Sequence, residues 1–168
     1  MQVREKIKAL TIEKRAFVGG RYVAAQDGAT MAKHISADGS ELSGIAACSE
    51  KDIDAAVQAA QAAFPAWAAK PPAQRKEIML RLADLMEQHL EELALLDAYE
   101  TGRAYRNYRD DSVPKAIEAL RYFAESVDKA YDAAIPPRGT DFGIVRRVPL
   151  GVVGAITPWN DPDRKSVV

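Results

Sequence analysis

One stretch near the C-terminus, Leu150–Asn160, constrains the fold more than any other part of the sequence. Its Val152–Ile156 portion is apolar and uncharged, which predicts a strand buried on both faces, as in a parallel sheet. Pro158 ends the run because it has no N–H to continue a ladder, and Trp159 and Asn160 follow directly. Ligands of open α/β sheets bind beside the carboxyl ends of such strands. Two interpretations stay open: a buried strand followed by a plain turn, or a strand whose end carries a binding site.

The composition limits the class of protein. The 168 residues allow one domain, or one domain and part of another. Hydrophobic residues make up 48% and charged residues 28%, which is typical of a globular protein. The net charge of −1 gives no electrostatic reason to expect nucleic acid or a membrane as partner. The one cysteine, Cys48, excludes an intramolecular disulfide and suits a reducing compartment, so we expect a cytoplasmic protein.

Short strands are predicted before the first helix. Phe17–Val23 places apolar and aromatic residues on both sides of a Gly-Gly pair, which indicates a hairpin. A phosphate-binding loop is disfavoured there because no helix pattern follows the glycines. Met31–Ile35 and Leu42–Cys48 predict two further strands. His34 and Cys48 have no ligand cluster or base beside them in the sequence, so we expect neither a metal site nor a nucleophile.

Helical patterns follow the strands. The first begins at Ser49, a residue type that caps helix N-termini, and is expected to end at the prolines at 65 and 71–72. The second covers about 73–102, with a break near residue 89 left open and Gly102 as the glycine that ends it. The third covers about 112–136, with Ser112 as cap and Pro114 in the first turn. Their apolar stripes are expected to bury a core. The stripes comprise Ile53, Val57, Ala60, Phe64, Ile78, Leu82, Leu85, Met86, Leu93, Leu96, Tyr99, Ile117, Leu120, Val127 and Tyr131.

Several of these segments are similar to a known family. Pro149–Asn160 resembles the segment by which NAD(P)-dependent aldehyde dehydrogenases enter their cofactor-binding domain. The resemblance covers about residues 12–160, which correspond only to the N-terminal part of the family's sequence. Asp110–Pro114, with Arg121–Glu125 and Val127–Lys129, resembles the branch that acts on γ-glutamyl-γ-aminobutyraldehyde and related ω-amino aldehydes. Phe64–Trp67, Pro72–Arg75, Leu82–Glu87 and Glu91–Ala94 match the family in order and spacing, and Phe17–Tyr22 and Glu100–Arg103 are similar to further family segments.

The resemblance implies roles for five residues near the C-terminus. Ile156, Thr157, Pro158 and Trp159 match the residues that line NAD or NADP in the family. Asn160 matches the catalytic amide that donates a hydrogen bond to the aldehyde-derived oxyanion. A neutral N–H donor suits that role because it stabilises charge that appears only in the transition state. No metal site is expected.

The expected fold class is α/β, as the N-terminal portion of the aldehyde dehydrogenase fold. Residues 1–135 would hold the N-terminal strands and helices of the cofactor-binding domain. Residues 136–150 would form an oligomerisation arm strand, and 151–160 the first strand of the Rossmann-like sheet. An exposed strand edge can pair with another subunit, so we expect a homo-oligomer. Residues 161–168 form an aberrant tail, charged where the family continues with apolar residues.

The implied activity is oxidation of a small aldehyde to a carboxylic acid with NAD or NADP. The family's nucleophilic cysteine and the glutamate that activates water lie beyond the position of Asn160, so this chain alone is expected to be inactive. A frameshift, premature termination or a fragmentary gene model would each produce such a truncated pattern. A non-catalytic binding or assembly module derived from the fold is the alternative. We also expect uncovered apolar surface, with self-association or marginal stability.

Overall fold

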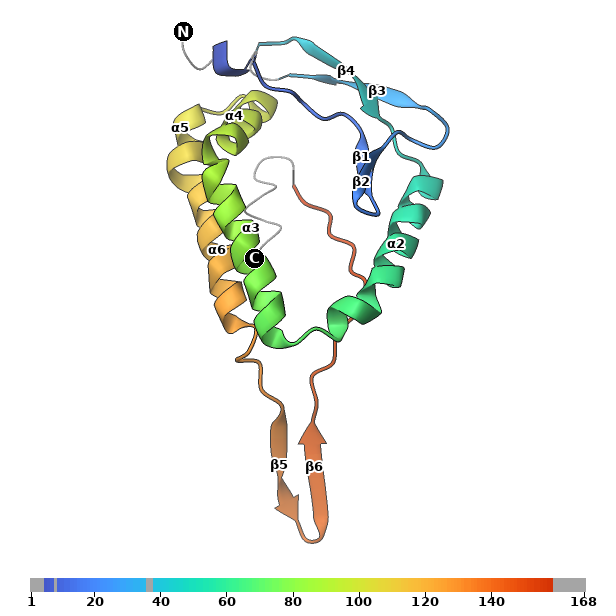
Figure 1. The fold of residues 1–168 in the computed structure, drawn as a ribbon, viewed down its shortest axis with the longest axis vertical. Helices are drawn as coiled ribbons and strands as arrows, with labels where there is room; N and C mark the ends of the chain where they lie inside the picture. The colour runs from blue at the N-terminus through green and yellow to red at the C-terminus, as the bar shows by residue number, and fades with distance from the viewer. Residues whose placement is uncertain (1–4, 8, 36–37, 159–168) are drawn as a thin grey trace.

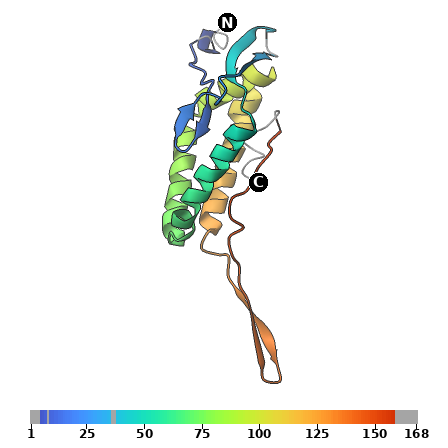
Figure 2. The same cartoon turned by 90° about the vertical axis from the view of Figure 1, so that its right-hand side faces the viewer.

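The computed structural model describes residues 5–7, 9–35 and 38–158 (Figure 1). Helices α3 and α6 lie side by side, whereas α2 stands apart from them (Figure 1). A long hairpin, β5–β6, projects beyond the helices in both views (Figures 1 and 2). The elements in chain order are β1 (Ala16–Val18), β2 (Arg21–Val23), β3 (Thr30–His34), β4 (Glu41–Ala46), α2 (Glu50–Ala68), α3 (Pro72–Gln88), α4 (Leu90–Thr101), α5 (Tyr105–Asn107), the π-helix η1 (Tyr108–Ser112), α6 (Val113–Ser126), β5 (Ala133–Arg138) and β6 (Asp141–Val145).

The described strands form three two-stranded antiparallel sheets, each a hairpin of consecutive strands. The predicted first hairpin is confirmed: Phe17 pairs with Tyr22, and Gly19 and Gly20 form the turn with φ of 58° and 80°. Glycine adopts such positive φ values without the penalty that a Cβ imposes. The strands predicted over 31–35 and 42–48 are β3 and β4, which pair with each other. Ser36 and Ala37 of their connecting turn lie outside the described residues.

Local signals set several helix ends as predicted. Helix α4 ends at Gly102, whose φ of 73° is the left-handed conformation that terminates helices. The helix start predicted at Ser112 and Pro114 is wrong, because α5 and η1 already carry helical backbone up to Ser112, which is itself helical and makes no side-chain cap hydrogen bond. The break near residue 89 is confirmed, because α3 ends at Gln88 and α4 begins at Leu90.

The core lies between α3, α4, η1 and α6. Tyr108 of η1 is fully buried, and its hydroxyl lies 2.9 Å from the Thr101 Oγ1 atom of α4. Helix α6 buries one face at helical spacing, which confirms Ile117 and Leu120 as core residues. The cluster consists of Ala83, Ala94, Ala98, Tyr108, Val113, Ile117 and Leu120, with Met79, Met86, Leu90, Leu93 and Tyr105 packed against it.

Two predicted helix ends are wrong. The third helix ends at Ser126, not near 136, and Tyr131 is 73% exposed. Residues 133–138 form β5 because β6 supplies a hydrogen-bonding partner, and a strand at an edge tolerates the prolines that a helix interior excludes. Pro65 lies inside α2, which continues to Ala68.

The predicted core stripes of α2 and α3 are also largely wrong for this chain. Asp52 is the buried residue of α2, and Ala83 that of α3. Ile53 is 58% exposed and Leu82 is 50% exposed. Of the predicted α3 stripe, Met86 packs against the core cluster, whereas Ile78, Leu82 and Leu85 remain exposed. Helical spacing therefore identified an apolar face but did not determine how much of it is covered. The expectation of uncovered apolar surface is confirmed.

The strand predicted over Val152–Ile156 is absent from the described part of the chain, where this segment forms no ladder. A strand satisfies its backbone groups by pairing with a neighbour, and no described strand lies in register with it. Ile156 is accordingly fully exposed. The apolar sequence is suited to a buried strand, but burial depends on a partner.

The core assignment predicts different costs for two isoleucine truncations. Ile117→Ala should lower the free energy of unfolding by about 2–5 kcal/mol, because it leaves a cavity in the packed core. Ile78→Ala on α3, where the side chain is largely exposed, should change it by less than about 1 kcal/mol. Urea denaturation followed by circular dichroism measures both. Equal losses would contradict the placement of the core.

Candidate functional site

The structure describes three of the five predicted site residues. Ile156, Thr157 and Pro158 follow one another in irregular, extended chain. Ile156 and Thr157 are exposed, and Pro158 is half-buried. Trp159 and Asn160 lie outside the described residues. The side chains of Ile156 and Thr157 in the predicted site are therefore accessible to solvent.

A second group of functional side chains gathers at the start of α2. Asp52 is 5% exposed, and its Oδ2 atom accepts hydrogen bonds from the backbone N–H of Ser49, at 2.8 Å, and from the Ser49 hydroxyl, at 2.9 Å. Its Oδ1 atom accepts the backbone N–H of Gln26 at 2.9 Å. The Ser49 and Gln26 donors hold the pKa of Asp52 below its ordinary value, because they favour the charged carboxylate. The carboxylate thus joins the helix start to a loop that lies far from it in sequence.

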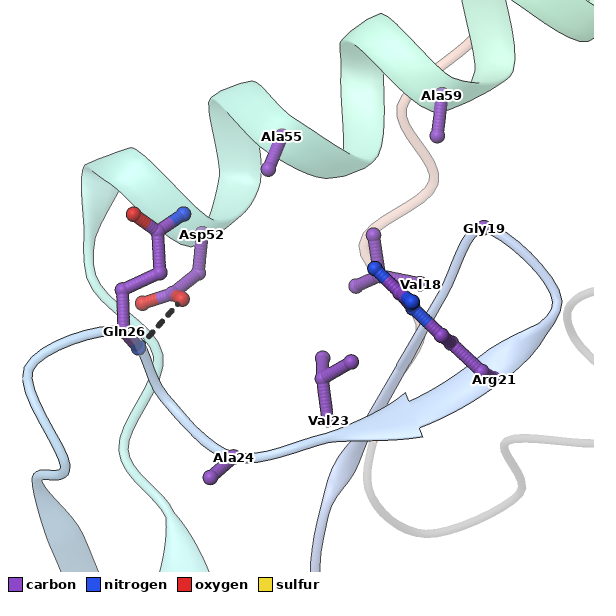
Figure 3. Close-up of a pocket in the computed structure, with 9 residues that line it drawn as sticks. All are labelled: Val18, Gly19, Arg21, Val23, Ala24, Gln26, Asp52, Ala55 and Ala59. Atoms are coloured by element: carbon purple, nitrogen blue, oxygen red, sulfur yellow. Dashed lines mark hydrogen bonds between the residues drawn. The ribbon is translucent and has the colours of Figure 1, made fainter.

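A cleft of about 420 Å³ opens between this helix and the first hairpin (Figure 3). Figure 3 shows the Arg21 side chain reaching from β2 toward α2 at one end, with Asp52 and Gln26 at the other end. Apolar side chains occupy the middle of the cleft. The lining comprises Val18, Gly19, Arg21, Val23, Ala24, Gln26, Asp52, Ala55 and Ala59.

Sequence reasoning identified one part of this group. The Ser-x-x-Asp spacing predicted the helix start at Ser49, and the bonds between Ser49 and Asp52 confirm it. No sequence pattern indicated a role for Arg21 or Gln26. Their position beside α2 depends on contacts with residues that are 26 or more positions away in sequence.

Other polar residues singled out from the sequence have ordinary surroundings. Glu100 accepts a hydrogen bond from the Lys33 Nζ atom of β3 at 2.7 Å. His34 and Cys48 are exposed. Within 5–7, 9–35 and 38–158, no three metal-ligating side chains come together. No helix in those same ranges combines the length and apolar character that crossing a bilayer requires.

Comparison with known proteins identifies the family. The pattern that defines the aldehyde dehydrogenase family matches residues 22–165. The chain belongs to this family. The NADP/NAD-dependent aldehyde dehydrogenase PuuC of Escherichia coli is 38% identical over 161 residues, which are 95% of this chain and 32% of that protein. The aminoacetaldehyde dehydrogenase of Pseudomonas aeruginosa is 39% identical over 155 residues, 91% of this chain and 31% of that protein.

Solved structures of aldehyde dehydrogenases share the fold. The aldehyde dehydrogenase KauB from Pseudomonas aeruginosa superposes with a TM-score of 0.93 at 39% identity, covering 98% of this chain and 34% of that one. The γ-glutamyl-γ-aminobutyraldehyde dehydrogenase of Burkholderia cenocepacia has a TM-score of 0.93 at 38% identity, covering 99% and 34%. These matches confirm the resemblance and the fold class. The chain spans about a third of the length of the curated relatives it matches.

The bonds of Asp52 predict a pH-dependent contribution to stability. Asp52→Ala should lower the urea midpoint at neutral pH, because it removes the acceptor of three hydrogen bonds. A carboxyl whose folded pKa is lowered stabilises the fold above its unfolded pKa of about 3.9, and loses that effect as the pH falls through the folded pKa. The difference between wild type and variant should therefore shrink below about pH 4.

The control is Asp54→Ala, an exposed carboxylate on the same helix. It should leave the neutral-pH midpoint close to that of the wild type. A difference between wild type and Asp52→Ala that stays constant down to the acid range would contradict the assigned role of the charged form.

Proposed function

We propose that this chain provides the N-terminal part of an NAD(P)-dependent aldehyde dehydrogenase, which oxidises an aldehyde to a carboxylic acid. The match of residues 22–165 to the family carries the proposal, because it continues through the predicted site. In this proposal Ile156, Thr157, Pro158 and Trp159 line the cofactor, and Asn160 donates to the oxyanion. Bound NAD or NADP supplies the hydride acceptor.

The described residues fit such a contact. Ile156 exposes its whole side chain, which is an apolar surface suited to a nicotinamide ring. Thr157 adds an exposed hydroxyl beside it. The indole-3-acetaldehyde dehydrogenase of P. syringae, which is 37% identical to this chain, has been solved in complex with NAD+. This supports the use of a nicotinamide cofactor by the complete enzyme.

The proposed substrate class is the ω-amino aldehydes. The sequence similarity at Asp110–Pro114 pointed to that branch. The Pseudomonas relative is named for aminoacetaldehyde, and the Burkholderia structure for γ-glutamyl-γ-aminobutyraldehyde. Each name describes an aldehyde whose carbon chain also carries nitrogen, a free amine in aminoacetaldehyde and an amide in the glutamyl compound, and this supports a nitrogen-bearing aldehyde as substrate.

We propose further that turnover requires groups beyond these 168 residues. Aldehyde oxidation by a covalent route requires an activated thiolate and a base for hydrolysis. Cys48, the one cysteine in the sequence, is exposed between β4 and α2. It is separate from the segment that carries the proposed cofactor contacts. We propose a cytoplasmic location, because the one cysteine of these 168 residues cannot form a disulfide within the chain.

The β5–β6 hairpin supports a role in assembly. It covers Ala133–Val145 and projects away from the helices (Figure 1). Phe142 is 70% exposed, and Ile144 is also exposed. Exposed strand edges with apolar side chains are a physical basis for pairing with another chain. We propose that this hairpin joins subunits of a homo-oligomer, which is also the action that the alternative, a non-catalytic assembly module, would perform.

The oxyanion role of Asn160 can be tested in a chimera. Residues 12–160 of this chain replace the matching third of the Pseudomonas aeruginosa aminoacetaldehyde dehydrogenase, and NADH absorbance reports oxidation of aminoacetaldehyde. We expect the chimera to be active. Asn160→Ala should lower kcat by about 100- to 1,000-fold, because a donor to the developing oxyanion is lost.

Asn107→Ala is the matched control, since Asn107 is an exposed amide on α5. It should leave kcat unchanged. An Asn160→Ala chimera with full kcat would contradict the proposed role of that residue, and a folded chimera without activity would contradict the proposed function. The unfused 168-residue chain should form no NADH, and turnover by it would overturn the claim that further groups are needed.

The assembly role predicts an effect of charge on the hairpin. Phe142→Lys should raise the dissociation constant of self-association by about 10-fold or more, because it places a charge in an apolar contact. Phe17→Lys, an equally exposed phenylalanine on β1, should leave it unchanged. Size-exclusion chromatography with light scattering measures the two masses. Identical behaviour of both variants would exclude the hairpin as the contact.

A further inference from the structure

The cleft between the first hairpin and α2 has a feature that the proposed oxidation does not use: opposite charges at its two ends. Arg21 lines one end, and no described acid forms an ion pair with its guanidinium. Asp52 lines the other end, and no described lysine or arginine forms an ion pair with its carboxylate. Figure 3 shows the two side chains separated along the cleft.

The Asp52 end of the cleft is buried and carries a negative charge. The carboxylate is 5% exposed and accepts three hydrogen bonds, two on Oδ2 from Ser49 and one on Oδ1 from the Gln26 backbone. The donors leave the net negative charge in place, because all three are neutral groups.

The middle of the cleft is apolar and is kept open by small side chains. Val23 and Ala24 contribute from the hairpin side, and Ala55 and Ala59 from α2. The Cβ atom of Ala59 would lie 3.8 Å from a Cβ at Gly19, so the hairpin turn meets the helix at ordinary contact distance. The volume of about 420 Å³ lies within the range of small-molecule sites, about 300–1,000 Å³.

We propose that this cleft binds a short ω-amino carboxylate. The carboxylate of the ligand pairs with the Arg21 guanidinium, its methylene chain lies along Val23 and Ala55, and its ammonium donates to Asp52. A guanidinium suits a carboxylate because its planar donors match the two oxygens. A simple anion would leave Asp52 without an oppositely charged partner, and a simple cation would leave Arg21 without one. A ligand with both charges is therefore the best match to the cleft. The inference is independent of the proposed oxidation.

A ligand-observed NMR titration with ε-aminocaproate tests this binding. The full 168-residue chain should bind it, and Arg21→Gln should weaken binding by about 10- to 100-fold, because the charged hydrogen bonds are lost. Arg81→Gln is the matched control, since Arg81 is exposed on α3 and outside the cleft lining. Circular dichroism of each variant reports whether the fold is retained.

The charge at the Asp52 end is tested through the ligand, since Asp52 also holds the helix start. Caproate lacks the ammonium and n-hexylamine lacks the carboxylate, so each should bind about 10-fold more weakly or worse. Caproate binding as tightly as ε-aminocaproate would overturn the role of Asp52, and an unchanged Arg21→Gln affinity would overturn that of Arg21. Absence of ε-aminocaproate binding, in the chain and in the chimera that retains the cleft, would overturn the proposal.

Discussion

The packing of α6 against α3 around Tyr108 is the interaction on which the rest of the structure depends. Tyr108 has no exposed surface, and its hydroxyl lies beside that of Thr101 on α4. Three of the six other buried members of the cluster are alanines, which let helices approach closely around one large ring. Arg121 of α6 also pairs with Asp84 and Glu87 of α3, but these groups are exposed and add less than the burial. One aromatic side chain thus fixes how three helical segments meet.

Helix α2 is held by a different kind of contact. The Asp52 carboxylate ties its first turn to Gln26, and the amide of Gln26 donates to the Lys51 carbonyl at 3.0 Å. Ile53 and Val57, on the apolar face of α2, are exposed. A hydrogen-bonded junction therefore positions this helix, whereas α6 is positioned by hydrophobic burial. The same junction forms one end of the cleft with Arg21, so the contact that orders the helix also shapes a candidate site.

The two proposals draw on different kinds of information. The dehydrogenase proposal follows from family membership and from residues adjacent in sequence, Ile156 to Asn160, because that segment is a continuous motif. The cleft proposal follows from Arg21, Gln26 and Asp52, which come from separate elements and meet through tertiary contacts. No sequence pattern predicts such a meeting, since each residue by itself is an ordinary polar side chain.

The sequence by itself determined the family and the local elements. Ser49 and Gly102 mark helix ends correctly, and the Gly-Gly pair of the first hairpin marks its turn, because these signals act through φ, ψ and hydrogen bonds within a few residues. Only the tertiary structure decided which apolar stripes are core, where the third helix stops, and that Val152–Ile156 forms no strand with the described chain. Each of these outcomes depends on a partner segment outside the element itself: β6 pairs with residues 133–138, and α3 packs against α6. The periodicity of apolar residues indicates which face of a helix or strand can be buried. Burial becomes favourable only where a neighbouring segment covers that face.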